Sequence, residues 1–178
     1  MQLDSIPAFN HGADRGTVNV VVETPKGSRH KYKYQPTLQA MTLDKVLPQG
    51  HVFPFDFGFI PETLCEDGDP LDVLVLLDDA VFPGCVVKCR LVGAIEATQT
   101  VDRRTFRNDR LVATPVRSVD FAEVRQLRDL NPGLRGQIRQ FFVSYNAAQG
   151  RRFRPLREVG AEAARKLLEA AIRTKAGS

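Results

Sequence analysis

The chain has 178 residues, of which 43% are hydrophobic and 26% charged, an ordinary composition for a globular protein that can bury one core. No apolar run reaches the length of a membrane span, and the first residues lack the basic and apolar regions of a signal peptide, so we expect a cytoplasmic protein without a membrane partner. The net charge of +4 is unevenly divided: residues 1–102 contain 8 basic and 14 acidic side chains, and residues 103–178 contain 17 and 7.

The first two thirds of the chain have the patterns of short strands. Residues 17–23 alternate, and residues 31–34 alternate so that Lys31 and Lys33 share one face of a strand. Further strands are expected over residues 72–77, 85–93 and 110–116. Several short strands at close spacing predict a barrel or a sandwich.

The last third has the patterns of helices. Ser118 or Asp120 could cap a helix that runs to about residue 130, and Asn131 with Pro132 forms a good cap and first-turn pair for the next helix. An amphipathic helix is expected over residues 161–173, supported by Glu162–Lys166 and Glu169–Arg173 pairs at i,i+4 spacing. Because the chain shows no repeats or long linkers, we expect one domain over residues 1–178.

The most unusual stretch is residues 66–72, where four acids occur within seven residues and no Lys or Arg lies between Val46 and Val87. Neighbouring carboxylates repel one another, so a fold that gathers them usually supplies a cation. Gly68 and Pro70 can turn the chain so that Asp67 and Asp69 face one side, where Asp72 can join them. Such an all-oxygen cluster suits Mg²⁺, Mn²⁺ or Ca²⁺, and an acidic surface turn is the alternative interpretation.

Two neighbouring features could complete a site for an anion. The aromatic stretch over residues 51–61 is typical of a buried core and could also form the wall of a site. Lys31, Lys33 and Lys45 are candidate anion ligands, although a lysine on a strand ordinarily extends into solvent.

These residues resemble the family I soluble inorganic pyrophosphatases from about residue 17 to residue 175. The family's Asp-x-Asp-Pro-x-Asp turn corresponds to Asp67 through Asp72, and residues 83–93, 111–115 and 141–145 agree in order and spacing. The resemblance implies an α+β fold that is mainly β: an OB-like five-stranded closed barrel with two or three flanking helices. It also implies a homo-oligomer, either a hexamer or a dimer.

The resemblance further implies metal-dependent hydrolysis of inorganic pyrophosphate to two phosphates, with Mg²⁺ as the cofactor and Mn²⁺ as an alternative. Asp69 would be the catalytic residue, as a metal ligand or as the base that takes a proton from the attacking water. The implied metal ligands are Glu23, Asp67, Asp69, Asp72 and Asp102. The implied substrate-binding residues are Lys31, Lys45, Arg110 and Tyr145.

The sequence also departs from the family pattern at positions of the site. Lys33 stands where the family has a glutamate, Lys45 replaces an arginine, and Asn146 replaces a lysine. Phe53 and Phe57 replace two tyrosines of the site.

The family's second acidic cluster is also altered. Gln99, Thr100 and Asn108 occupy its positions, with Arg110 at the following lysine, and Asp102 or Asp109 could substitute only by a shift of register. Because the site loses carboxylates and gains a cation, we expect a weak or altered pyrophosphatase.

Two other functions remain open at this point. The alternative is a catalytically deficient relative that binds phosphate anions or a partner protein through its lysines. The basic last third could instead bind nucleic acid, but solvated arginines and subunit contacts are the favoured interpretation of its charge, so we do not expect a nucleic-acid partner.

Overall fold

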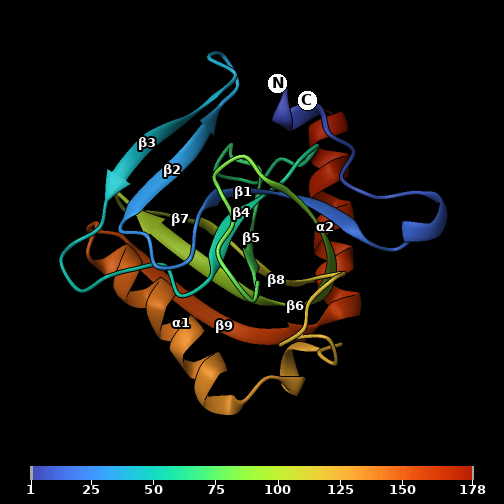
Figure 1. Ribbon diagram of the computed structural model, residues 1–178. Helices are drawn as coiled ribbons and strands as arrows, with labels where there is room; N and C mark the ends of the chain where they lie inside the picture. The colour runs from blue at the N-terminus through green and yellow to red at the C-terminus, as the bar shows by residue number, and fades with distance from the viewer. Residues whose placement is uncertain (1, 178) are drawn as a thin grey trace.

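The computed structural model describes residues 2–177, and its centre is a closed ring of five strands (Figure 1). The ring consists of β1 (Val18–Thr24), β4 (Asp56–Ile60), β5 (Leu71–Val75), β8 (Arg110–Pro115) and β6 (Val86–Val101), in that order. It closes because the first part of β6 pairs with β1 and the next part pairs with β8. This arrangement confirms the predicted OB-like barrel.

The strand β6 is longer than the sequence pattern predicts and continues beyond the barrel. Its last residues pair with β7 (Arg104–Arg107), and β9 (Arg152–Gly160) pairs with it from Gly93 to Thr100. The β6–β7 turn places Asp102 and Arg103 at φ values of 47° and 67°. Both residues of this tight hairpin turn are exposed.

A separate two-stranded sheet lies beside the barrel. It consists of β2 (His30–Gln35) and β3 (Ala40–Val46), which project from the ring of strands in Figure 1. Tyr34 is buried against Phe59 of β4, with ring centroids 6.2 Å apart, so one face of β2 is fixed to the barrel. Lys31 lies opposite Lys45 in the hairpin register.

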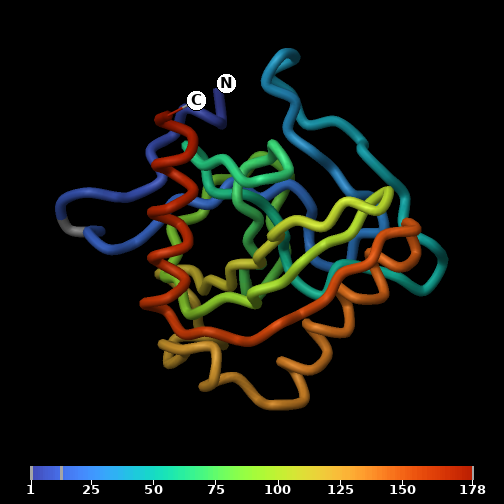
Figure 2. Tube along the Cα trace, turned by 180° about the vertical axis from the view of Figure 1, so that it is seen from behind, coloured from blue at the N-terminus to red at the C-terminus, as the bar shows by residue number. Residues whose placement is uncertain are grey.

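Two α-helices flank the barrel, and β9 runs from one to the other in both views (Figures 1 and 2). The helix α1 (Pro132–Ala147) begins as predicted, because Asn131 Oδ1 accepts a hydrogen bond from the Gly133 N–H at 2.8 Å. The helix α2 (Ala161–Ala176) contains the predicted Glu162–Lys166 pair at 2.9 Å. Glu169 pairs with Arg165 at 3.1 Å rather than in the predicted register.

The predicted helix from Ser118 or Asp120 to about residue 130 is wrong. The segment forms turns, a bend and the short 3₁₀ helix η3 (Leu127–Asp129). Its polar groups have tertiary partners: Asp78 accepts the N–H groups of residues 119 and 120, and Arg90 donates to the carbonyls of residues 122 and 124. Side chains from outside the segment thus satisfy backbone groups that a helix would otherwise pair.

The core is divided between the two faces of the barrel strands. Val73 of β5 and Leu111 of β8 pack with Leu168 of α2, whereas Leu74 packs in the cluster that contains Phe142 of α1. Since side chains alternate along a strand, Asp72 of β5 lies on the same face as Leu74 and opens toward α1. No helix within residues 2–177 is both long and apolar enough to span a membrane.

Candidate active site

Residues 66–72, here called the acidic corner, form the last part of the connection from β4 to β5 and the first two residues of β5. Gly68 has a φ of +83°, which favours glycine, and its N–H donates to the Cys65 carbonyl at 3.0 Å. Cys65 N–H in turn donates to the Asp69 carbonyl at 2.9 Å, and Asp67 Oδ1 accepts the Asp69 N–H at 3.1 Å. The local sequence therefore fixes the backbone that carries Asp67 and Asp69.

Asp69 is paired with a cation from the β2–β3 hairpin. Lys33 Nζ lies 2.6 Å from Asp69 Oδ1, with the Asp69 side chain 50% exposed and the Lys33 side chain 33% exposed. Lys33, which stands where the family has a glutamate, thus contacts the predicted catalytic residue directly. The contact joins two segments that are far apart in sequence.

Asp72 is paired with Arg110 of β8, and Arg110 Nη1 lies 2.6 Å from Asp72 Oδ2. The arginine side chain is 6% exposed, and its guanidinium lies 5.6 Å and 5.5 Å from the ring centroids of Phe142 and Phe153. Arg110 also donates to Asn108 Oδ1. Arg110, which was predicted to bind phosphate, is therefore already held by a carboxylate and two aromatic rings.

An amide pair lies beside Arg110. Asn108 Nδ2 donates to Gln99 Oε1 at 2.9 Å, and both side chains are buried. These amides occupy positions where the resemblance implies acids, so this wall of the site adds no negative charge.

Glu23 of β1 lies beneath the hairpin, and its Oε1 accepts the Tyr34 N–H at 2.7 Å. Burial raises the pKa of Glu23 to about 7; the Tyr34 hydrogen bond and Lys31 oppose this shift, and Asp72 adds to it. Burial by itself would lower the pKa of Lys31, but Tyr145, Asp72 and Glu23 raise it above its usual value. Glu23, Lys31 and Asp72 thus lie within electrostatic reach of one another.

The remaining predicted substrate ligands line the same side. Lys31 and Lys45 each place Nζ 3.8 Å from Asp44 Oδ2, and Lys45 donates to Gln149 Oε1 at 2.9 Å. Burial lowers the pKa of Lys45, and Arg151 adds to the effect. The two lysines are therefore gathered on one face of the hairpin.

Tyr145 of α1 is buried in the aromatic stretch. Its ring centroid lies 5.6 Å from those of Phe53 and Phe141. The aromatic residues upstream of the acidic corner therefore belong to the core, and Phe57 also lies beside a predicted substrate ligand, with Lys31 Nζ 5.9 Å from its ring centroid.

A cleft of about 640 Å³ lies between the acidic corner and the β6–β7 hairpin. Asp67, Asp69 and Asp102 line it together with Arg104 and Arg151. Because acidic and basic side chains both line it, the cleft suits a small anion bound together with a metal cation.

Asp109, the other residue considered as a replacement acid, has different partners. Its Oδ1 accepts the Ala97 N–H at 2.9 Å and its Oδ2 accepts from Arg107 Nη2 at 2.9 Å. Asp102, rather than Asp109, shares a cleft with the acidic corner.

The carboxylates of the acidic corner suit a divalent cation by their chemistry but do not form a finished metal site. Within residues 2–177, no three His, Cys, Asp or Glu side chains converge as a ready-made metal site. The carboxylates nevertheless have the right chemistry: in the described part of the chain Asp67 forms no ion pair, and the ion pairs of Asp69 and Asp72 each use one carboxylate oxygen. Burial raises the pKa of Asp67, and Asp72 and Asp69 add to the shift. The donor set fits a cation that would share the acidic corner with Lys33 and Arg110.

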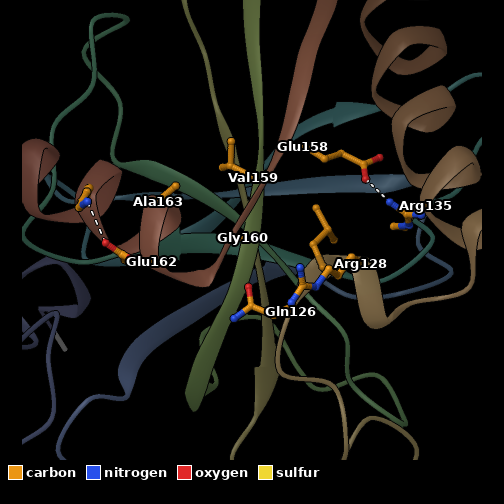
Figure 3. A pocket seen from close by; sticks show the side chains of 10 residues that line it. Gln126, Arg128, Arg135, Glu158, Val159, Gly160, Glu162 and Ala163 are labelled. Carbon is orange, nitrogen blue, oxygen red and sulfur yellow. Dashed lines mark hydrogen bonds and ion pairs between the residues drawn. The ribbon is translucent and has the colours of Figure 1, made fainter.

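A second cleft, of about 590 Å³, lies between η3, β9 and α2 (Figure 3). Its charged groups largely neutralise one another: Arg135 Nη1 lies 2.6 Å from Glu158 Oε2, and Glu162 pairs with Lys166 (Figure 3). Because it lacks the predicted ligands, we place the candidate active site at the acidic corner.

Sequence reasoning missed two partners of the site. The long-range pairing of β9 was not predicted, so Phe153 was not expected to pack on Arg110. The Lys33–Asp69 contact was not expected either, although a lysine in place of the family's glutamate at position 33 could have indicated a contact with an acid of the site.

Comparisons with known proteins agree with this fold and these motifs. The inorganic pyrophosphatase family pattern matches residues 20–176. An inorganic pyrophosphatase of a Nostoc species is 38% identical over 82% of this chain and 82% of its own length, and that of Thermus thermophilus is 35% identical over 84% and 82%.

Solved structures show the same relationship. The crystal structure of the Thermus thermophilus inorganic pyrophosphatase has a TM-score of 0.87 at 32% identity, covering 98% of this chain and 99% of that one. The Neisseria gonorrhoeae inorganic pyrophosphatase has a TM-score of 0.86 at 30% identity, covering 97% and 98%. This chain therefore belongs to the inorganic pyrophosphatase family of hydrolases.

Proposed function

We propose that this enzyme hydrolyses inorganic pyrophosphate to two phosphates with the help of a divalent cation, Mg²⁺ or Mn²⁺, and that its turnover is weak or altered. The observation that carries the proposal is the cleft in which Asp67 and Asp69 face basic side chains. Family membership supports the reaction. The ion pairs of Asp69 and Asp72 support the reduced turnover.

In this proposal the substrate binds through its phosphate oxygens. Lys31 and Lys45, both anchored near Asp44, would bind one phosphate, and Arg110 and Tyr145 would bind the other. The rings around Arg110 limit its movement, so its charge is positioned before substrate arrives. Binding would thus rely on preformed positive charge.

The chemical step needs a base and a stabilised leaving phosphate. Asp69 would take a proton from water through the carboxylate oxygen that does not pair with Lys33. The water oxygen forms a bond to one phosphorus as the bridging P–O bond breaks, and the bridging oxygen leaves with the second phosphate. One or more divalent cations, held by Asp67 and Asp72 with Glu23, Asp102 and, where it is not the base, Asp69 as further ligands, would neutralise phosphate charge and make the water more acidic.

Weak turnover follows from the charges around this step. Lys33 occupies one carboxylate oxygen of the proposed base, Asp69, so only the other oxygen is available to accept a proton or to contact a cation. The amides of Gln99 and Asn108 offer no additional negative charge to a cation.

Steady-state phosphate release tests the proposal directly. The enzyme and that of Thermus thermophilus should be assayed side by side with pyrophosphate and Mg²⁺, and then with Mn²⁺. We expect metal-dependent release that is slower for this enzyme. Equal turnover would contradict the weak-activity part, and no release with either metal would contradict the hydrolase assignment for this substrate.

A second candidate function is binding of phosphate anions or a partner without efficient hydrolysis. It is favoured by the lysines of a single hairpin, since Lys31, Lys33 and Lys45 all face the site region. Asp69→Asn separates the candidates: hydrolysis should collapse, while pyrophosphate binding measured by calorimetry should persist or tighten. Binding that disappears together with hydrolysis would argue against the binding role.

We also infer a homo-oligomer, a hexamer or a dimer, from the family resemblance. Light scattering coupled to size-exclusion chromatography measures the mass directly. A monomer at micromolar concentration would contradict this inference.

A further inference from the structure

The contact between Lys33 and Asp69 is unusual because it brings a cation to the centre of a candidate cation site. Lys33 comes from the β2–β3 hairpin, outside the barrel ring, and its Nζ lies 2.6 Å from Asp69 Oδ1. Tyr34, the next residue, is buried in contact with Phe59, so the hairpin that presents Lys33 is anchored to the barrel. The ammonium is therefore delivered to Asp69 by a fixed element.

The surrounding charges show how much this one lysine changes. Four carboxylates lie in this part of the site, those of Glu23, Asp67, Asp69 and Asp72. Three cations face them, those of Lys31, Lys33 and Arg110. Without the lysine at position 33, two cations would face these four carboxylates, and an acid there would add a fifth carboxylate. Divalent cations bind more tightly as the local negative charge increases.

We propose that the Lys33 ammonium competes with a divalent cation for Asp69 and thereby sets the metal affinity of this active site. This inference rests on the proposed cation site at the acidic corner. When Lys33 remains on Asp69, a cation can use Asp67 and the second oxygen of Asp72; when a cation takes Asp69 Oδ1, which Lys33 contacts, the ammonium must move into solvent. The partial exposure of both side chains, 33% and 50%, leaves room for that movement.

Titration of the metal-free full-length enzyme with Mn²⁺ alone tests the competition. The free Mn²⁺ signal in electron paramagnetic resonance gives the affinity without any substrate. We expect Lys33→Met to bind Mn²⁺ about tenfold more tightly than the natural enzyme, and Lys33→Glu to bind more tightly still, because each step removes positive charge beside the carboxylates. Lys33→Arg, which keeps the cation, should stay close to the natural affinity.

Lys88→Met is the matched control. Lys88 pairs with Asp14 through a similar Lys–Asp contact on another part of the surface, so its loss changes the net charge equally. We expect no change in Mn²⁺ affinity for this variant. Equal tightening in Lys88→Met and Lys33→Met would overturn the proposal, because it would reduce the effect to overall charge.

The outcome is separable from the proposed hydrolysis. Unchanged or weaker Mn²⁺ binding in Lys33→Met, with a melting temperature showing that the variant is folded, overturns the role of Lys33 even if pyrophosphate is hydrolysed. Tighter binding supports it even if phosphate release is absent. The phosphate-release assay decides the hydrolysis by itself.

Discussion

The two walls of the candidate site are built from opposite kinds of side chain. The acidic corner contributes Asp67, Asp69 and Asp72 from one short connection, while the facing wall of β6, β7 and β8 contributes amides and arginines. Apart from Asp102 in the β6–β7 turn, the carboxylates that line this cleft lie on one side. The difference shows that an acid-rich turn alone does not make a strong metal site, since its charge is neutralised from the opposite wall and from the hairpin.

The test with the largest expected effect removes the proposed base from the acidic corner. Asp69→Asn keeps the shape of the side chain but cannot accept the proton, so phosphate release should fall by at least about 100-fold. Asp79→Asn, which changes an exposed aspartate outside the site, should leave release unchanged. Residual activity above a tenth of the natural rate would remove Asp69 as the base.

The next test breaks the facing wall. Arg110→Met leaves Asp72 without its ion-pair partner and removes the guanidinium between two rings, so the free energy of unfolding should fall by about 3 kcal/mol. Urea unfolding measures this change. Arg165→Met, which breaks an exposed pair with Glu169, should cost less than about 1 kcal/mol. Similar losses in both variants would mean that burial of the Asp72–Arg110 pair carries little energy.

A third test makes the walls more alike. Asn108→Asp adds a carboxylate beside Arg110 and should raise Mn²⁺ affinity about 3-fold or more, since the new negative charge lies on the wall of amides and arginines. Asn131→Asp is the control, because aspartate caps α1 as well as asparagine and adds the same charge elsewhere. If both variants bind Mn²⁺ alike, the facing wall does not limit the affinity.

The smallest expected effect concerns a buried carboxylate that, within residues 2–177, forms no ion pair. Burial raises the pKa of Asp56 above its ordinary value of 3.8, and its Oδ1 accepts the Val81 N–H at 3.1 Å. Between the unfolded pKa and the higher folded pKa, the folded state binds more protons, so stability falls as pH rises through that interval.

Asp56→Asn removes this titration. The variant should therefore gain stability relative to the natural enzyme as pH increases above about 4, as followed by urea unfolding from pH 4 to pH 7. Asp79→Asn should show no such trend. A pH-independent difference between Asp56→Asn and the natural enzyme would indicate that Asp56 titrates alike in both states.

Much of the fold could be predicted because its signals are local. Short alternating or apolar runs predict strands at β1, β5, the first part of β6 and β8, and Asn131 with Pro132 marks the start of α1 at the correct residue. The failures involve long-range partners. The region after Ser118 forms turns because Asp78 and Arg90 bind its backbone, and β9 is a strand because it pairs with β6. Neither partner lies within the local sequence window.

The candidate site divides in the same way. The gathering of carboxylates at residues 66–72 can be inferred from local sequence, because Gly68 and Pro70 restrict a short turn that carries them. The cations that face those carboxylates depend on long-range packing: Lys33 from the hairpin contacts Asp69, and Arg110 from β8 contacts Asp72. Coulomb energies depend on distance in space, and barrel closure brings together charges that the order of residues keeps apart.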